Sequence, residues 1–173
     1  MSAFPSIQPI KGIREVFKYP DDSSKQRAIF AVAESVLRSP SPLSIADRET
    51  IAAFTSSLNH CEFCQGSHTT FALKEGADPE EIALVTNGEY EKHRLAPLFE
   101  YIKILTLNPS SLTEDDYHKV INAGFTEIEL HDAILVGAAF NMFNRIVEGH
   151  RVERNADTWE ASSKRIHEFG YGA

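Results

Sequence analysis

The apolar positions of this chain do not alternate with polar ones in the two-residue period of a half-buried strand. From residue 25 onward, polar residues and prolines instead mark where helices begin and end. The longest apolar run, residues 133–143, has about half the roughly 20 residues that a membrane span needs, and it contains Gly137 and Asn141. We expect a buried core helix there and no membrane partner. The pattern predicts an all-α fold.

Capping residues predict the helix boundaries. Ser44 followed by Asp47 forms a capping box, in which the two side chains satisfy free backbone amides at a helix start. Asp78 and Pro79 supply the cap and first-turn proline of a later helix, and Gly76 suits the end of the preceding one. The predicted helices cover residues 25–38, 45–58, 61–75, a segment from 79, 93–107, 114–123, 127–148 and 157–168.

The first 24 residues differ from the rest. Pro5, Pro9 and Pro20 each lack an amide donor and restrict the preceding residue, so we expect an extended arm over residues 1–24 rather than a helix. At 173 residues in total, the chain is sized for one domain with one sizeable core. Residues 25–173 are predicted to form that domain.

The chain carries 17 Lys and Arg against 25 Asp and Glu, a formal charge of −8. This balance disfavours nucleic acid and anionic membranes as partners, because both require a positive surface. The N-terminus lacks the basic start and apolar core of a signal peptide, so we expect a cytoplasmic protein. In a reducing compartment, a close cysteine pair is more often catalytic or metal-binding than a structural disulfide.

Cys61 and Cys64, the only cysteines, are followed by His68. In a helix successive residues turn about 100°, so this spacing places all three side chains on one stripe. Cys61 lies near the predicted helix start, where free amides and the helix dipole favour a thiolate. We therefore expect a lowered pKa at Cys61.

Glu49 is the predicted fourth member of this group. If the helices on either side of residues 59–60 form a hairpin, Glu49 lies level with His68, on an apolar face of its helix. Buried carboxylates are seldom unpaired, and His68 is the natural partner. The arrangement predicts a proton relay from Glu49 through His68 to Cys64, with Cys61 positioned to trap the oxidised form of Cys64.

Other interpretations of the pair remain open. Free cysteines are often buried as small apolar residues without chemistry. A zinc site would use Cys61, Cys64 and His68, with His60 or a carboxylate as the fourth ligand, but no second ligand pair follows in the sequence. A c-type haem requires histidine at position 65, which is Gln65. No cofactor is expected.

The block from residue 43 to residue 68, about 26 residues with a glutamate twelve positions before the first cysteine, resembles the AhpD-like alkylhydroperoxidases of the carboxymuconolactone decarboxylase superfamily, particularly the peroxidase-related branch. Residues 140–145 resemble a later helix of that branch. The resemblance implies a helical bundle, a homo-oligomer that is a dimer or hexamer, and a hydroperoxide substrate.

The resemblance also implies roles for the cysteines. Cys64 would be oxidised by peroxide to a sulfenic acid, Cys61 would resolve it as a disulfide, and a lipoyl group or thioredoxin-like carrier would restore the dithiol. The best-known members have a histidine directly before the second cysteine, where this chain has Phe63. Decarboxylases of the superfamily lack the cysteine pair, which argues against their activity here.

A non-catalytic function is the alternative. The pair would then open and close a disulfide that changes subunit contacts, as in a thiol redox sensor.

Overall fold

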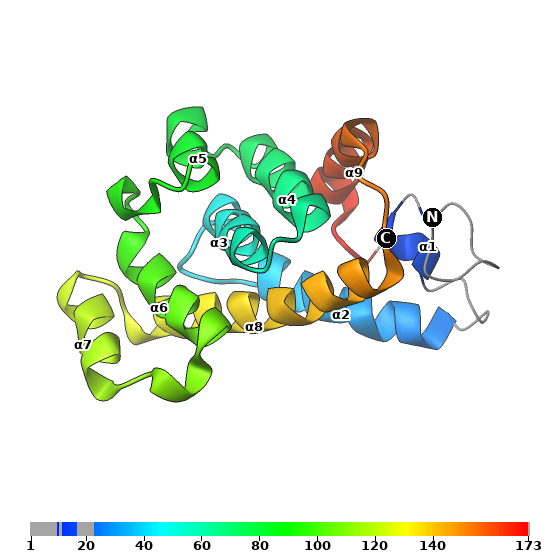
Figure 1. The fold of residues 1–173 in the computed structure, drawn as a ribbon. Helices are drawn as coiled ribbons and strands as arrows, with labels where there is room; N and C mark the ends of the chain where they lie inside the picture. The colour runs from blue at the N-terminus through cyan, green and yellow to red at the C-terminus, as the bar shows by residue number, and fades with distance from the viewer. Residues whose placement is uncertain (1–9, 11, 17–22, 173) are drawn as a thin grey trace.

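The computed structural model describes residues 10, 12–16 and 23–172, and every regular element in these ranges is helical (Figure 1). The all-α prediction is confirmed. The α-helices are α1 (Ile13–Val16), α2 (Ser23–Arg38), α3 (Ile45–Leu58), α4 (Glu62–Lys74), α5 (Pro79–Thr86), α6 (Ala96–Leu107), α7 (Glu114–Asn122), α8 (Glu127–His150) and α9 (Ala156–Phe169). Two short 3₁₀ helices are Tyr90–Lys92 and Pro109–Ser111. Over the same ranges, no helix combines the length and apolarity required to cross a bilayer.

The helices begin close to where the capping residues predict. The Asp47 amide donates to Ser44 Oγ (3.0 Å) and the Ser44 amide donates to the Asp47 carboxylate (3.2 Å), which completes the capping box of α3. Thr113 and Thr126 cap α7 and α8 in the same way. α6 begins three residues later than predicted and α8 ends two residues later, at His150. Local capping therefore explains most boundaries.

The predicted extended arm, residues 1–24, lies largely outside the described residues. Within it, Ile13–Val16 forms one helical turn where the prolines predict extended chain, and α2 begins at Ser23 rather than at residue 25. Ile10 is buried, and its carbonyl accepts a hydrogen bond from the Glu153 amide (2.9 Å). This part of the chain packs on the segment between α8 and α9.

α3 lies at the centre of the fold. All of its residues from 47 to 56 are buried, and it packs against α2, α4, α5, α6 and α8. Stacked rings of Phe54 and Phe99, with centroids 4.4 Å apart, join α3 to α6. Gly137 lets α6 and α8 approach closely, because a Cβ there would lie 3.0 Å from an α6 side chain. The central position of α3 explains how Glu49, midway along it, is 0% exposed.

A tight turn between α3 and α4 is held against α8. His60 adopts a left-handed conformation (φ 55°) in this turn. The side-chain Nδ2 of Asn59 donates to Oδ1 of Asn141 (3.1 Å) and to Oδ1 of Asn144 (2.9 Å). The side-chain Nδ2 of Asn144 donates to Ser56 Oγ (2.9 Å). These bonds fix the start of α4, where both cysteines lie.

Candidate active site

The two cysteines lie at the start of α4 as free thiols. Cys61 is the N-cap residue and Cys64 lies in the first turn, and they are 0% and 3% exposed. The side chain of Cys64 and the carboxylate of Glu148, near the end of α8, both act on the Cys61 thiol. The contact with Cys64, burial and this carboxylate all disfavour a thiolate, so they raise the pKa of Cys61.

This raised pKa shows that the expected thiolate at Cys61 is wrong. The Cys64 backbone does favour the thiolate, as a helix start should. The thiol of Cys61 is nevertheless fully buried and faces a second sulfur and a carboxylate, and these outweigh the helix start. Cys61 therefore rests as a thiol, which suits a group that acts second.

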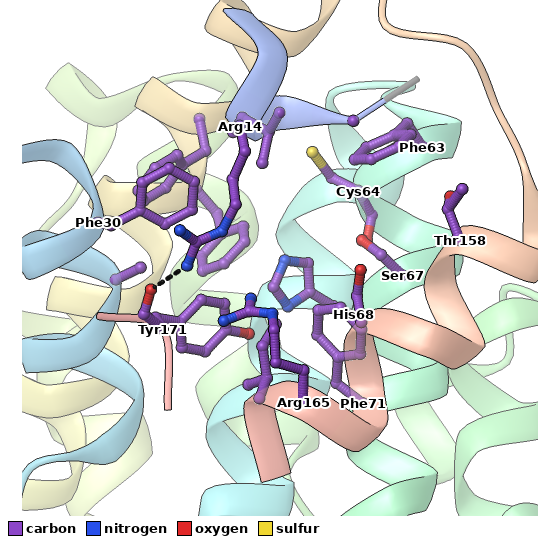
Figure 2. Close-up of a pocket in the computed structure, with 17 residues that line it drawn as sticks. Arg14, Phe30, Phe63, Cys64, Ser67, His68, Phe71, Thr158, Arg165 and Tyr171 are labelled. Carbon is purple, nitrogen blue, oxygen red and sulfur yellow. Dashed lines mark hydrogen bonds between the residues drawn. The ribbon is translucent and has the colours of Figure 1, made fainter. Parts of the chain in front are cut away.

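A cavity of about 160 Å³ lies beside Cys64 (Figure 2). Its wall is mainly apolar and includes Phe30, Phe63, Phe71, Phe140 and Phe143. The polar side chains around it include Arg14, Ser67, His68, Thr158 and Arg165. Cys64 and His68 stand one helical turn apart on α4, and both line this cavity.

His68 and Glu49 are in direct contact, as the hairpin geometry predicts. The Nδ1 atom of His68 lies 2.6 Å from Oε2 of Glu49. An imidazole that donates its Nδ1–H to a carboxylate keeps Nε2 as the acceptor. Because His68 lines the cavity, the side chain is placed to act as a base toward a group bound there.

Two further side chains bind the other oxygen of Glu49. Arg38 Nη1 lies 2.7 Å from Oε1, and the Tyr171 hydroxyl donates to Oε1 at 2.9 Å. Burial by itself raises the pKa of Glu49, but His68, Arg38 and Tyr171 outweigh it, so the pKa is lowered. Glu49 is thus a carboxylate whose charge is balanced by Arg38.

Sequence reasoning missed Arg38, Tyr171 and Glu148. Arg38 ends α2, where the helix dipole favours a cation in any case, so its position carries no special signal. Tyr171 lies 122 positions from Glu49 in the sequence, and no motif marks it. Side chains that meet only through tertiary packing have no fixed spacing that a pattern could detect.

Phe63, which replaces the histidine of the best-known family members, belongs to the apolar wall. It is 9% exposed and meets Trp159 of α9 edge to face, with centroids 6.2 Å apart. His60 is exposed and lies outside the site. In the described part of the chain, no group of three or more His, Cys, Asp and Glu side chains is arranged to hold a metal ion.

Known proteins resemble the chain in sequence and in fold. Residues 25–89 match the carboxymuconolactone decarboxylase family. Sestrin-3 of Mus musculus is 28% identical over 135 residues, which cover 76% of this chain. The chain spans only 27% of the length of Sestrin-3.

Two solved structures share the fold. An uncharacterized peroxidase-related protein from Silicibacter sp. TM1040 has a TM-score of 0.73 at 23% identity, covering 84% of this chain and 77% of that one. An uncharacterized peroxidase-related protein from Ralstonia eutropha JMP134, described as an alkylhydroperoxidase AhpD core, has a TM-score of 0.74 at 19% identity, covering 94% and 96%. At these identities, the similarity shows the helical fold.

Proposed function

We propose that this protein, whose residues 25–89 match the carboxymuconolactone decarboxylase family and which shares the fold of an AhpD core, is a thiol-dependent peroxidase that reduces organic hydroperoxides. The resemblance seen in residues 43–68 is confirmed at the level of superfamily and fold. One observation carries the proposed activity: the buried hydrogen bond between Glu49 and His68, at the wall of the cavity that Cys64 also lines.

Arg38 allows His68 to act as a base. Because the guanidinium lies 2.7 Å from Glu49, the carboxylate has a counter-charge without a protonated imidazole. A neutral His68, oriented by Glu49, takes the proton from the Cys64 thiol. The Cys64 sulfur then attacks the peroxide, and the O–O bond breaks. The leaving alkoxide takes the proton from His68, which yields an alcohol and a sulfenic acid at Cys64.

Cys61 resolves the sulfenic acid. Its sulfur bonds to the Cys64 sulfur, the S–O bond breaks, and the hydroxide takes up a proton and leaves as water. Glu148 is the group that we assign to remove the Cys61 proton, since its carboxylate raises the pKa of this thiol. Glu148 is also exposed, so the proton reaches solvent. In this role Glu148 takes the place of the histidine that the best-known AhpD-like proteins carry at the position of Phe63.

A dithiol then returns two electrons by thiol–disulfide exchange. Both sulfurs are buried, so a slender dithiol such as a dihydrolipoyl arm reaches them more readily than a thiol on a protein surface, as in a thioredoxin-like carrier. The cavity is similar in size to an engineered cavity of about 150 Å³ that binds benzene. This size favours small organic hydroperoxides.

The proposal is tested by turnover of tert-butyl hydroperoxide with dihydrolipoamide as reductant. The unmodified protein should consume many equivalents, Cys64→Ser should consume none, and Cys61→Ser should be oxidised once. Ser57→Ala serves as a control for a small side-chain change near the turn between α3 and α4. The Ser57 hydroxyl donates to the Phe54 carbonyl of its own helix (2.7 Å), so its removal should leave turnover unchanged. Loss of about one equivalent of peroxide by the unmodified protein would contradict an enzymatic role.

Replacing Glu148 tests the resolving step. In Glu148→Gln, sulfenic acid should form at the normal rate, whereas the disulfide should form about tenfold more slowly, since a base contributes ~10²–10⁴ when fully positioned. Rapid quench and mass spectrometry separate the two steps. Glu153→Gln, a change outside the contacts of Cys61, should leave both steps unaltered.

A redox sensor is the second candidate, and the burial of both sulfurs favours it. With exposures of 0% and 3%, the disulfide is poorly placed for rapid reduction by a protein partner. In a sensor, one oxidation event would persist and alter subunit contacts. Stoichiometric oxidation together with a changed sedimentation coefficient would support this candidate over the enzyme.

A further inference from the structure

The segment that follows α9 turns back into the molecule and places Tyr171 in the candidate site. Tyr171 is 5% exposed and lines the cavity together with Cys64 and His68 (Figure 2). Gly170 makes the turn with φ of 76°. The left-handed backbone favours glycine here, and a Cβ at this position would also lie 2.6 Å from the Glu34 carboxylate.

The backbone of Tyr171 is attached to two other elements. Its amide donates to Oε2 of Glu34 in α2 (2.6 Å), and its carbonyl accepts a hydrogen bond from Arg14 in α1 (2.8 Å; Figure 2). The ring lies nearly parallel to that of His68, at 15° and 6.4 Å between centroids, and the Arg38 guanidinium lies 5.0 Å from the ring centre. Backbone and ring are therefore held independently of the hydroxyl.

The hydroxyl completes the shell around Glu49. It and Arg38 bind Oε1, while His68 binds Oε2, so both oxygens have partners and the plane of the carboxylate is set. Burial, followed by the nearby charge of Glu49, raises the pKa of Tyr171 well above its usual range. The phenol therefore stays protonated and always donates.

We propose that Tyr171 is a positioning residue, whose hydroxyl fixes the Glu49 carboxylate so that Oε2 is directed at Nδ1 of His68. The proposal rests on the proposed function, in which His68 removes the proton from Cys64. Without the hydroxyl, Glu49 remains buried and paired, but it has one donor fewer. A carboxylate with fewer donors is free to rotate, so Oε2 no longer stays directed at Nδ1 and the imidazole loses its fixed tautomer and orientation.

The charged and titratable groups around this pair come from several elements. They are Arg14 of α1, Arg38 of α2, Arg48 of α3, Cys64 and Glu75 at the two ends of α4, Arg165 of α9, and Tyr171 itself. α8 contributes the ring of Phe140, whose centroid lies 4.4 Å from that of His68. None of these groups is changed by removal of the hydroxyl alone.

Tyr171→Phe tests the proposal, with Tyr117→Phe as a matched control. The control removes a tyrosine hydroxyl that also donates to a glutamate, Glu127 (2.6 Å), but on the exposed surface. We expect Tyr171→Phe to lower kcat with tert-butyl hydroperoxide about tenfold and to leave the KM for the peroxide unchanged. Tyr117→Phe should match the unmodified protein. A kcat of Tyr171→Phe equal to that of the control would overturn the proposal.

A second measurement separates this proposal from the proposed function. Nitrogen-15 NMR of the imidazole groups follows the protonation and tautomer of His68 without any turnover. A smaller share of the Nδ1–H tautomer of His68 in Tyr171→Phe supports positioning even if the protein reduces no peroxide, and an unchanged share refutes it.

A second variant, which removes a backbone hydrogen bond of Tyr171, tests the proposal if Tyr171→Phe does not fold. Glu34→Ala removes the acceptor of the Tyr171 amide but leaves the hydroxyl in place. Since the loosened segment no longer holds the hydroxyl on Glu49, the same loss of the Nδ1–H tautomer of His68 is expected. An unchanged tautomer share in a folded Glu34→Ala protein would count against the proposal.

Discussion

Glu49 carries a negative charge in the buried stretch of α3, and side chains from three other parts of the chain stabilise it there. Arg38 supplies the opposite charge, while His68 and Tyr171 supply hydrogen bonds. Burying a carboxylate is costly unless it is paired and hydrogen-bonded. The same shell that makes this charge tolerable also orients the base that we assign to Cys64.

Replacing the counter-charge should destabilise the protein strongly. For Arg38→Met we expect the free energy of unfolding in urea to fall by about 3 kcal/mol at pH 7, because a buried carboxylate loses its ion pair. Arg94→Met is the control: Arg94 pairs with Asp47 and Glu81 but is 53% exposed, so its loss should cost at most about 1 kcal/mol. Equal losses in both variants would contradict the argument.

The same variant should show a defined pH dependence. The folded pKa of Glu49 is lowered, so its contribution to stability is complete above the unfolded pKa of about 4.3 and is lost as pH falls through the folded pKa. The difference in unfolding free energy between the unmodified protein and Arg38→Met should thus be constant above about pH 5 and shrink below pH 4. Urea titrations across this range measure it.

At the scale of helices, the cavity beside Cys64 depends on the close packing of α9 against α4. Gly66 faces the ring of Trp159, and a Cβ at position 66 would overlap that ring. α9 in turn contributes Thr158, Ser162 and Arg165 to the cavity beside Cys64. Gly66 thereby controls how closely α9, which forms one wall of the cavity, approaches α4.

Gly66→Ala should push α9 outward. We expect a loss of about 1–3 kcal/mol in unfolding free energy from overpacking, together with a raised KM for tert-butyl hydroperoxide. Gly149→Ala is the matched helical control, since its Cβ meets open space and should stabilise the protein by about 0.5 kcal/mol. A Gly66→Ala protein as stable as Gly149→Ala would show that α9 does not pack as described.

At the scale of the whole molecule, the cavity is assembled from distant parts of the chain. Its lining comes from α1, α2, α4, α8, α9 and Tyr171, so the site forms only when these elements have packed together. The described residues form one AhpD-like helical fold, in agreement with the sequence. The extended arm and the homo-oligomer implied by the family resemblance stay predictions.

Local sequence determined the helices and the central pair of the site. Caps such as Ser44 and Thr126 act on amides within three residues, so they mark helix starts without knowledge of the fold. The hairpin around residues 59–60 is also local, which is why the contact of Glu49 with His68 follows from helical geometry alone.

Only the tertiary structure decided the surroundings of that pair. Arg38, Glu148 and Tyr171 reach the site from three separate elements. The neighbouring Cys64 side chain and the burial of Cys61 itself reverse the pKa shift expected for Cys61. The physical reason is that desolvation and long-range contacts depend on which elements pack together. Helix period and capping, which act over a few residues, carry no information about that packing.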